Sequence, residues 1–275
     1  MSSQTAFFGR FGRFETAGLV GFSSINCASA PRNTCNDLCV FETRDLFLCI
    51  FRSSRSNEAI GFKPSAAAAA LSSARIVDSF LFPIKLIRNQ TARGFAANHN
   101  QAYAQAGGQF FCVANPDIRL NSDPFHALLA CLEDPSVGVA APLVLSDGGT
   151  IEDSARHFPS PSKILCKAFG GCKGSDYRVQ DVVIHPDWVG GMFMVFPRGV
   201  FDRLGGFDQR YFLYYEDVDI CARLRLLGYE VSLSPHAQVY HHAHRSSHHD
   251  FRYLRWHLTS MLRFFVSPAY RKLSK

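Results

Sequence analysis

The sequence predicts an α/β domain in which a largely parallel central sheet is covered by helices on both faces. Apolar strands and helices alternate along the chain from Pro83 onward, which is typical of βα units. The length of 275 residues, with 47% hydrophobic and 19% charged residues, is that of a globular protein with a sizeable core. The region before residue 81 lacks this alternation, so we expect it to be atypical.

The first eighty residues show only weak periodicity. Residues 40–51 (VFETRDLFLCIF) fit a strand, a hairpin or a helix, and the sequence does not choose among them. Further on, Pro64 precedes a run of serine and alanine. Proline at a first helical position, followed by alanines, predicts a helix that ends at about Phe80.

The next part of the chain alternates regularly. The expected elements are a strand at 84–87, a turn at 89–94, a helix at 95–106, a strand at 109–114, a helix at 124–133 and a strand at 137–144. Gly107 and Gly108 stop the first helix, and Asp123 can cap the second. The strand at 109–114 ends at Asn115-Pro116-Asp117, and ligands of open α/β sheets bind beyond such strand ends.

The remaining elements follow a long loop. The expected order is a loop at 145–187, a strand at 189–196 interrupted by Gly190 and Gly191, a helix at 197–204, a helix at 218–227, a strand at 229–233 and a basic tail. Gly228 ends the longer helix, and Pro235 follows the last strand.

Cysteine usage and hydropathy restrict the class of protein. Nine cysteines without a C-x-x-C pair predict buried free thiols rather than a disulfide framework or a structural zinc site. No apolar run approaches the roughly 20 residues that span a bilayer. Arg10 and Arg13 precede no continuous apolar segment, so no signal peptide is evident and we expect a cytoplasmic protein.

The positive charge is concentrated at the end of the chain. The net charge is +6, and residues 236–275 contain seven Arg and Lys residues against a single acidic residue, Asp250. Such a tail, which also carries aromatic residues, suits peripheral contact with an anionic membrane at the inner face of the cell membrane. Packing of the last helix onto the domain is the alternative role. No nucleic-acid-binding module accompanies the charge, so no nucleic acid is expected as a partner.

The stretch from residue 188 to residue 229 is the richest in chemistry. It contains a Gly-Gly turn, then Gly-Gly-Phe-Asp, then the acidic residues Glu216, Asp217 and Asp219 at the start of a helix. Carboxylates at a helix start, directly after several aromatic residues, suggest an acid/base site that handles carbohydrate. The alternative is that these carboxylates only complement the helix dipole.

With these residues, with RGFAANHN at 93–100 and with Asn115-Pro116-Asp117, the chain resembles the family 2 glycosyltransferases over about residues 82–263. It is most similar to their rhamnosyltransferase-like branch. The resemblance implies a GT-A fold, which is Rossmann-like. It implies an inverting transfer of a sugar such as rhamnose from a nucleotide-diphosphate donor to a bacterial surface polysaccharide or a lipid-linked glycan.

The resemblance also assigns the reacting groups. It makes Asp217 the general base, with Glu216 in support, because the acceptor hydroxyl must lose its proton as it attacks. It places Asp117 on a divalent metal, manganese or magnesium, with help from His241, for which His242 is the alternative. Asn115 stands where most relatives have an acidic residue, and it can donate a carbonyl oxygen to a hard cation.

Two further groups of residues follow from the resemblance. Arg93, Gly94, Asn98 and Asn100 would face the donor nucleotide, since a helix N-terminus after a glycine offers N–H groups to phosphate. Trp188, Gly190 and Gly191 would face the acceptor, with the indole as a stacking surface. The alternatives are a solvent-facing helix cap for the first group and a buried tryptophan beside a tight bend for the second.

The resemblance divides the chain into an atypical N-terminal region at 1–80, a core at 81–240 and a basic tail at 241–275. Relatives begin with two strands that bind the nucleotide, and residues 1–80 contain no such pattern. A shifted reading frame could produce the composition of this region, which is rich in Ser, Arg, Cys and Phe. The alternative function is therefore a catalytically defective remnant or glycan-binding module of the same fold. A basic, His-rich protein that binds nucleic acid or metal is a third interpretation.

Overall fold

A computed structural model describes residues 37–42, 46–51, 84–89, 91–115, 117–171, 174–241 and 251–273. The helix expected to end at Phe80 and the alternative metal residue His242 lie outside these ranges. None of the helices within them is long and apolar enough to cross a membrane.

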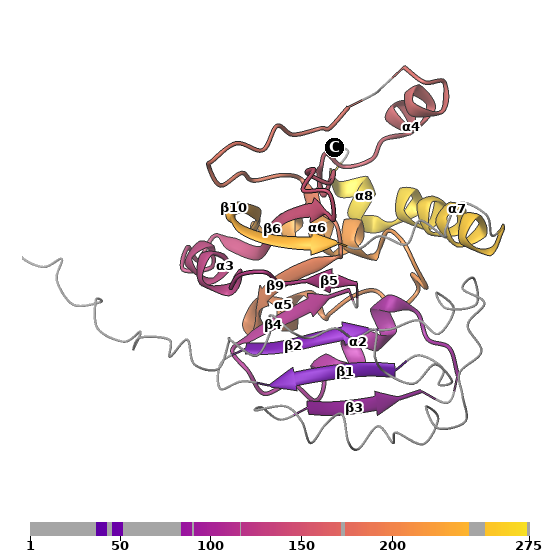
Figure 1. The fold of residues 1–275 in the computed structure, drawn as a ribbon. Helices are drawn as coiled ribbons and strands as arrows, with labels where there is room; N and C mark the ends of the chain where they lie inside the picture. The colour runs from indigo at the N-terminus through magenta and orange to yellow at the C-terminus, as the bar shows by residue number, and fades with distance from the viewer. Residues whose placement is uncertain are drawn as a thin grey trace, which may run out of the picture.

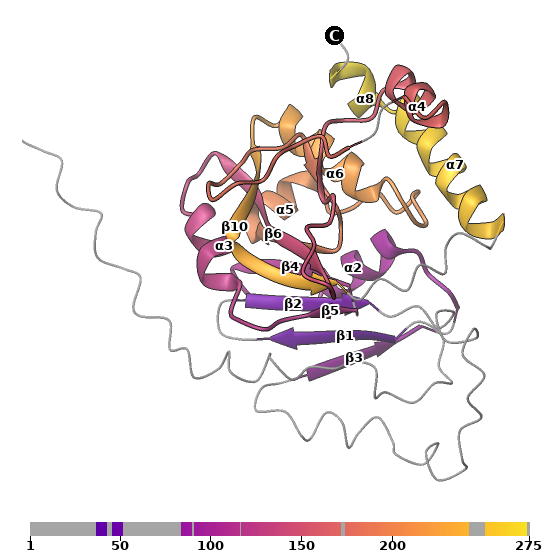
Figure 2. The same ribbon diagram turned by 45° about the horizontal axis from the view of Figure 1, so that its top comes forward.

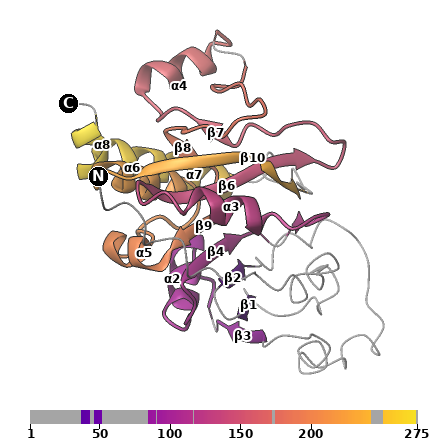
Figure 3. The ribbon, with the colours of Figure 1, turned by 90° about the vertical axis from the view of Figure 1, so that its left-hand side faces the viewer.

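The fold is built on an eight-stranded sheet with the strand order β3-β1-β2-β4-β9-β6-β10-β5 (Figure 1). Its strands are β1 (Asp37–Glu42), β2 (Leu46–Phe51), β3 (Ile84–Arg88), β4 (Phe110–Ala114), β5 (Ile118–Arg119), β6 (Val137–Ser146), β9 (Phe193–Pro197) and β10 (Glu230–His241). A second, two-stranded sheet consists of β7 (Ala155–Arg156) and β8 (Trp188–Val189). Figure 3 shows the strands stacked from β3 to β10, with β7, β8 and α4 beyond β10.

The described helices are α2 (Phe95–Tyr103), α3 (Phe125–Cys131), α4 (Pro161–Ala168), α5 (Arg198–Leu204), α6 (Glu216–Leu226), α7 (Phe251–Val266) and α8 (Pro268–Leu273). The pairs β2·β4 and β6·β10 are parallel, and the other neighbouring pairs of the large sheet are antiparallel. As a result β2, β3, β4, β6 and β10 run in one direction, while β1, β5 and β9 run in the other. The predicted α/β class is confirmed.

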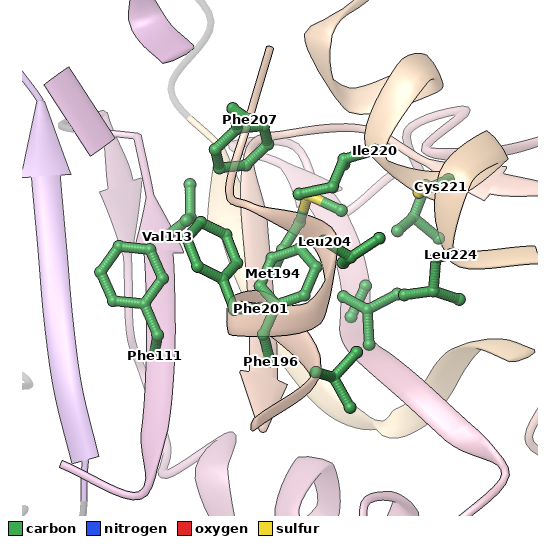
Figure 4. Packing of buried hydrophobic residues seen from close by; sticks show 14 of the residues in the cluster. Phe111, Val113, Met194, Phe196, Phe201, Leu204, Phe207, Ile220, Cys221 and Leu224 are labelled. Carbon is green, nitrogen blue, oxygen red and sulfur yellow. The ribbon is translucent and has the colours of Figure 1, made fainter. Parts of the chain in front are cut away.

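Alternate residues of the central strands face two separate cores, because successive side chains of a strand point to opposite faces. Phe111 and Val113 of β4 pack with α2, α5 and α6 on one face. Cys112 and Ala114 pack with α3 on the other face. Figure 4 shows the first of these cores, where Phe201 of α5 lies among side chains of β4 and β9. Helices thus cover both faces of the sheet, as predicted.

Several predicted elements differ from the observed ones. In the stretch 40–51, where the sequence allowed three structures, the described residues belong to β1 and β2, which pair antiparallel. The strand expected at 189–196 is split at its Gly-Gly pair, so that β8 belongs to the small sheet and β9 to the large one. The last strand continues to His241, and a register irregularity between Ser234 and Gln238 accommodates Pro235, which has no N–H for the ladder.

The thiols follow the prediction only in part. Cys112 and Cys221 are buried and free, and Cys131 is free and partly exposed. Cys166, at the end of α4, is disulfide-bonded, which corrects the expectation of free thiols at this position.

Candidate active site

The candidate site lies at one edge of the large sheet, where β4, β6 and β10 have their carboxyl ends. His241 ends β10 and pairs with Ser146 at the end of β6 on one side. On its other side it pairs with Ile118 of β5, directly after Asp117. The sequence places these residues far apart, and the sheet register brings them together.

His241 lies between two carboxylates. Its Nε2 is 3.4 Å from Oδ2 of Asp117, and its Nδ1 is 2.8 Å from Oε2 of Glu152. Burial lowers the pKa of His241, but the hydrogen bonds and negative charges of Asp117 and Glu152 outweigh that effect and raise it to about 9. The predicted pair of Asp117 and His241 is therefore joined in space, with Glu152 as a third member.

Glu152 was missed by the sequence analysis. It lies in the expected loop at 145–187, and its N–H donates to the carbonyl of Val144, which folds this segment back along β6. No motif surrounds Glu152, and 89 positions separate it from His241. Only the pairing of the strands places its carboxylate beside the histidine.

Asp117 and His241 are residues of the types that can hold a divalent cation. Oδ1 of Asp117 is buried and has no hydrogen-bond partner among the described residues. Those residues contain no group of three or more His, Cys, Asp or Glu side chains arranged to hold a metal. A magnesium site commonly uses one or two carboxylates together with substrate phosphates. A metal-binding histidine commonly donates its other ring N–H to a carboxylate, the place that Glu152 occupies.

The acidic pair lies at the start of α6 behind an unusual turn. Tyr214 and Tyr215 both adopt the left-handed conformation, with φ of 69° and 67°. This conformation is strained for bulky residues and persists only where the surrounding packing imposes it. It turns the chain sharply into α6 and places Glu216 and Asp217 in the first turn of the helix.

The two carboxyl groups of the pair differ in their surroundings. Oδ2 of Asp217 accepts a hydrogen bond from the N–H of Gly191 at 3.0 Å, and Oδ1 accepts one from Val218 at 2.8 Å. Glu216 is 5% exposed, and its Oε2 has no partner among the described residues. Burial raises the pKa of both groups, and the charge of Asp217 raises that of Glu216 further, to well above its usual range. Burial therefore favours the neutral form of both carboxyl groups, and the upward shift of the pKa is the larger one at Glu216.

A short path of contacts connects the acidic pair to the Asp117 cluster. Gly191 donates to Asp217, and the carbonyl of Met192 accepts the N–H of Asn115 at 2.9 Å. Asn115 and Asp117 flank a single residue directly after β4. Both groups of candidate residues therefore lie at the same edge of the sheet.

The residues expected at the acceptor lie beside Asp217. Gly190 donates to the carbonyl of Ser154 at 2.8 Å, which continues the β7·β8 pairing toward Gly191. Trp188 is partly exposed, its Nε1 donates to the carbonyl of His157 at 3.0 Å, and the guanidinium of Arg156 lies 5.8 Å from its ring centroid. The structure thus places an aromatic ring and a cation on one side of the candidate base.

The asparagines expected at the nucleotide bond to the chain itself. Asn98 is fully buried, and its amide donates to the carbonyls of Gly94 and Arg93 and accepts from Asn89. Asn100 donates to the carbonyl of Phe207 at 2.8 Å and accepts the N–H of the same residue at 2.9 Å. These bonds hold α2 to its neighbours.

Gly94 has a similar structural role. A Cβ at this position would lie 2.7 Å from the Cα of Phe212, and the N–H of Phe95 donates to the carbonyl of Phe212 at 2.9 Å. The backbone of Phe212 therefore fills the space beside Gly94 in which a phosphate was expected. Arg93 is exposed and donates to Gln101 at 2.9 Å.

Comparison with known proteins gives the family. The family model described as glycosyl transferase family 21 matches residues 84–269. Rhamnosyltransferase WbbL from Escherichia coli (strain K12) is 32% identical over 189 residues, an alignment that covers 63% of this chain and 70% of the relative. N-acetylglucosaminyl-diphospho-decaprenol L-rhamnosyltransferase from Mycobacterium tuberculosis (strain ATCC 25618 / H37Rv) is 28% identical over 202 residues, which cover 62% of this chain and 66% of the relative.

Among solved structures, the mannosyltransferase PcManGT from Pyrobaculum calidifontis, in complex with GDP-Man and Mn2+, is similar with a TM-score of 0.42 and 18% identity. The match covers 64% of this chain and 46% of that protein. The resemblance to rhamnosyltransferase-like glycosyltransferases of the GT-A type is confirmed. With a family model that matches most of its length, the chain belongs to glycosyl transferase family 21.

Proposed function

We propose that the protein is an inverting, metal-dependent glycosyltransferase that moves a sugar, such as rhamnose, from a nucleotide-diphosphate donor to a glycan acceptor. The observation that carries this proposal is the meeting of two groups at one sheet edge. Asp217 is held by the N–H of Gly191, and the cluster of Asp117, His241 and Glu152 lies beyond the adjoining Met192–Asn115 hydrogen bond.

Asp217 is the general base of the proposed reaction. It takes the proton of the acceptor hydroxyl while that oxygen attacks the anomeric carbon and the bond from this carbon to the diphosphate breaks. The raised pKa of Asp217 makes it a stronger base than an exposed aspartate. Burial and the charge of Asp217 favour the neutral form of Glu216, which would leave the negative charge of the pair on Asp217.

Asp117 and His241 would hold a divalent metal, manganese or magnesium, at the donor diphosphate. A bound cation would neutralise the charge that develops on the leaving diphosphate. Glu152 fixes the ring of His241 through Nδ1, so that Nε2 faces Asp117.

The acceptor is a bacterial surface polysaccharide or a lipid-linked glycan. The name of the mycobacterial relative specifies a sugar-diphosphate on a decaprenol lipid as its acceptor, which supports the lipid-linked class. Trp188 offers a face for stacking on a sugar, and Gly190 and Gly191 bring the backbone close to Asp217. An acceptor of this kind would keep the protein at the inner face of the cell membrane.

A catalytically defective remnant, or a glycan-binding module of the same fold, is the competing proposal. It is favoured by Asn98 and Asn100, whose side chains are engaged with backbone groups of the protein rather than available to a nucleotide. Such a protein would bind an acceptor glycan but no sugar nucleotide.

Calorimetric titration of the whole chain with dTDP, UDP and GDP, each with and without manganese, tests these proposals. Metal-dependent binding of one nucleotide is expected, with loss of binding in Asp117→Ala. Asp217→Asn is the matched control, because it should retain nucleotide binding while transfer falls by about 100-fold to 10,000-fold. No binding by the folded protein would reject the enzyme and favour the remnant.

A further inference from the structure

The outer face of α7 is an exposed apolar stripe. It consists of Phe251, Leu254, Leu258, Leu262 and Val266, whose spacing of three and four residues places them along one side of the helix. Their exposed fractions run from 45% for Leu258 to 87% for Phe251. Figure 2 shows α7 extending along the outside of the molecule, away from the large sheet.

The charge around this stripe has one sign. Arg252 and Arg255 are exposed on α7, and Arg271 and Lys272 are exposed on α8. Residues 251–273 contain no aspartate or glutamate. An apolar stripe with an excess of cations beside it, here against the single acidic residue Asp250 of the tail, is the pattern of helices that lie in the interface of an anionic membrane.

The inner face of α7 is fixed to the segment that precedes the acidic pair. The ring centroid of Trp256 lies 4.8 Å from that of Phe212. The ring centroid of His257 lies 5.4 Å from that of Tyr214 and 5.5 Å from that of Tyr215. In addition, Oγ of Ser260 donates to the carbonyl of Leu213 at 2.9 Å. The helix is therefore held against residues 212–215, which turn the chain into Glu216 and Asp217.

We propose that α7 is a membrane-docking helix, with its stripe in the interface of an anionic lipid bilayer and its arginines on the lipid phosphates. The docking is argued from α7 alone, and only its role, to bring the protein to a lipid-linked acceptor, rests on the proposed function. The charge favours lipid over a second copy of this chain, since a seam of two such helices would bring two segments of the same positive charge together.

The geometry gives the docking a consequence for the site. Residues 212–215 lie on the opposite side of α7 from the stripe, so the width of one helix, about 10 Å, separates them from the bilayer. Docking would hold the start of α6 near the lipid surface, where the sugar of a lipid-linked acceptor is presented.

Co-sedimentation of the whole chain with vesicles tests this proposal. The wild type is expected to bind phosphatidylglycerol-containing vesicles and to bind pure phosphatidylcholine weakly. Replacement of both arginines in R252Q/R255Q should weaken binding by about fivefold for each arginine. The variant L254S/L258S/L262S should weaken it by at least about tenfold. All of these side chains are exposed, so circular dichroism should show the wild-type fold.

Val182→Ser is the matched control, because Val182 is 60% exposed on a loop far from α7 in the sequence, and it should bind as the wild type does. Failure of the wild type to bind anionic vesicles overturns the proposal, as does equal binding by the triple-leucine variant. A dimer in ultracentrifugation that the triple-leucine variant dissolves would identify a second copy as the occupant. Nucleotide titration is unaffected by these outcomes, so failure of the docking proposal and failure of the proposed function are distinguishable.

Discussion

At the scale of single residues, Glu216 and Asp217 form a buried pair of carboxyl groups whose pKa values are both raised by burial. Glu216 is buried and has an oxygen without a partner among the described residues, whereas Asp217 accepts two backbone hydrogen bonds. Backbone N–H groups stabilise the ionised form, and burial destabilises it. The sequence showed two adjacent acids, but it could not show which of them the fold would keep neutral.

The pair makes the stability of the protein depend on pH. Because burial and Asp217 raise the pKa of Glu216 in the folded state, the unfolded chain loses this proton first as the pH rises. The contribution of this proton to the free energy of unfolding is complete below about pH 4.5, the ordinary pKa of a glutamate. Above this pH it falls by up to about 1.4 kcal/mol per pH unit until the pKa of Glu216 in the folded state is passed. Glu216→Gln has no such proton, so its free energy of unfolding should fall less than that of the wild type above this pH.

Urea unfolding of both proteins across this pH range measures the difference. Glu133→Gln provides a control with an exposed glutamate on the loop after α3, and it should follow the wild type. Parallel curves for Glu216→Gln and the wild type would contradict the assignment of the proton to Glu216.

Glu152 illustrates a residue that acts through another residue. Its carboxylate accepts from Nδ1 of His241, which leaves Nε2 directed at Asp117. Glu152→Gln should weaken manganese binding by about 10-fold to 100-fold, since outer carboxylates of metal-binding histidines contribute at this level. Titration of manganese followed by electron paramagnetic resonance measures this without any need for turnover.

Asp153→Asn is the control for Glu152. Asp153 is the adjacent carboxylate, but it pairs with Arg156 at 3.0 Å, and the described carboxylates beside His241 are those of Asp117 and Glu152. Manganese affinity should be unchanged in this variant. Equal losses in both variants would show a general electrostatic effect rather than the orientation of the histidine ring.

At the scale of elements, the start of α2 and residues 212–215 support one another. The close approach of Gly94 to Phe212 leaves no room for a side chain, and Ser260 of α7 holds Leu213 from the other side. The left-handed pair Tyr214 and Tyr215 follows directly. We infer that α2 and α7 together impose the strained turn that orients Glu216 and Asp217.

Gly94→Ala tests this support. Its Cβ would overlap the backbone of Phe212, so the segment must shift, and we expect a loss of about 1–3 kcal/mol in the free energy of unfolding. Gly199→Ala in α5 is the control, because a Cβ there would meet nothing within 4 Å beyond its chain neighbours and the backbone of its own helix. Alanine also favours a helix, so stability should be unchanged or slightly higher. Chemical denaturation of both variants gives the comparison, and equal stability would show that residue 212 moves freely.

The elements also show what the sequence could and could not predict. Local periodicity and helix-stop residues placed α2, α3, α5 and α6 to within a few residues, because their signals lie within the elements themselves. The split of residues 189–196 between two sheets was not predicted, since both halves are apolar and only the partner strands differ. Gly94 and Asn98 were assigned to the donor nucleotide, whereas they contact the backbone of the protein itself. The sequence could not separate the two cases, because a glycine and an asparagine suit close contact with a phosphate and with a backbone segment equally well.

At the scale of the whole molecule, the two described segments of the N-terminal region, 37–42 and 46–51, take part in the large sheet. The sequence indicated no nucleotide-binding strands before residue 81, yet β1 and β2 lie between β3 and β4, and β2 runs parallel to β4. Parallel pairing depends on contacts between residues distant in the chain, which periodicity does not reveal. The boundary expected at residue 80 thus falls between strands of one sheet.

Removal of residues 1–80 tests whether this pairing protects the central sheet. The N–H of Asn115 points to Met192 on the β9 side, so the N–H groups of Phe111 and Val113 also point to β9, while those of Cys112 and Ala114 point to β2. In the whole chain all four amides should exchange slowly with deuterium. Without β2, the amides of Cys112 and Ala114 should exchange at least about tenfold faster, while those of Phe111 and Val113 stay protected as internal controls. Uniform protection in both proteins would mean that β2 does not pair with β4, whereas fast exchange at all four positions in the truncated protein would mean that the sheet needs the N-terminal strands to fold.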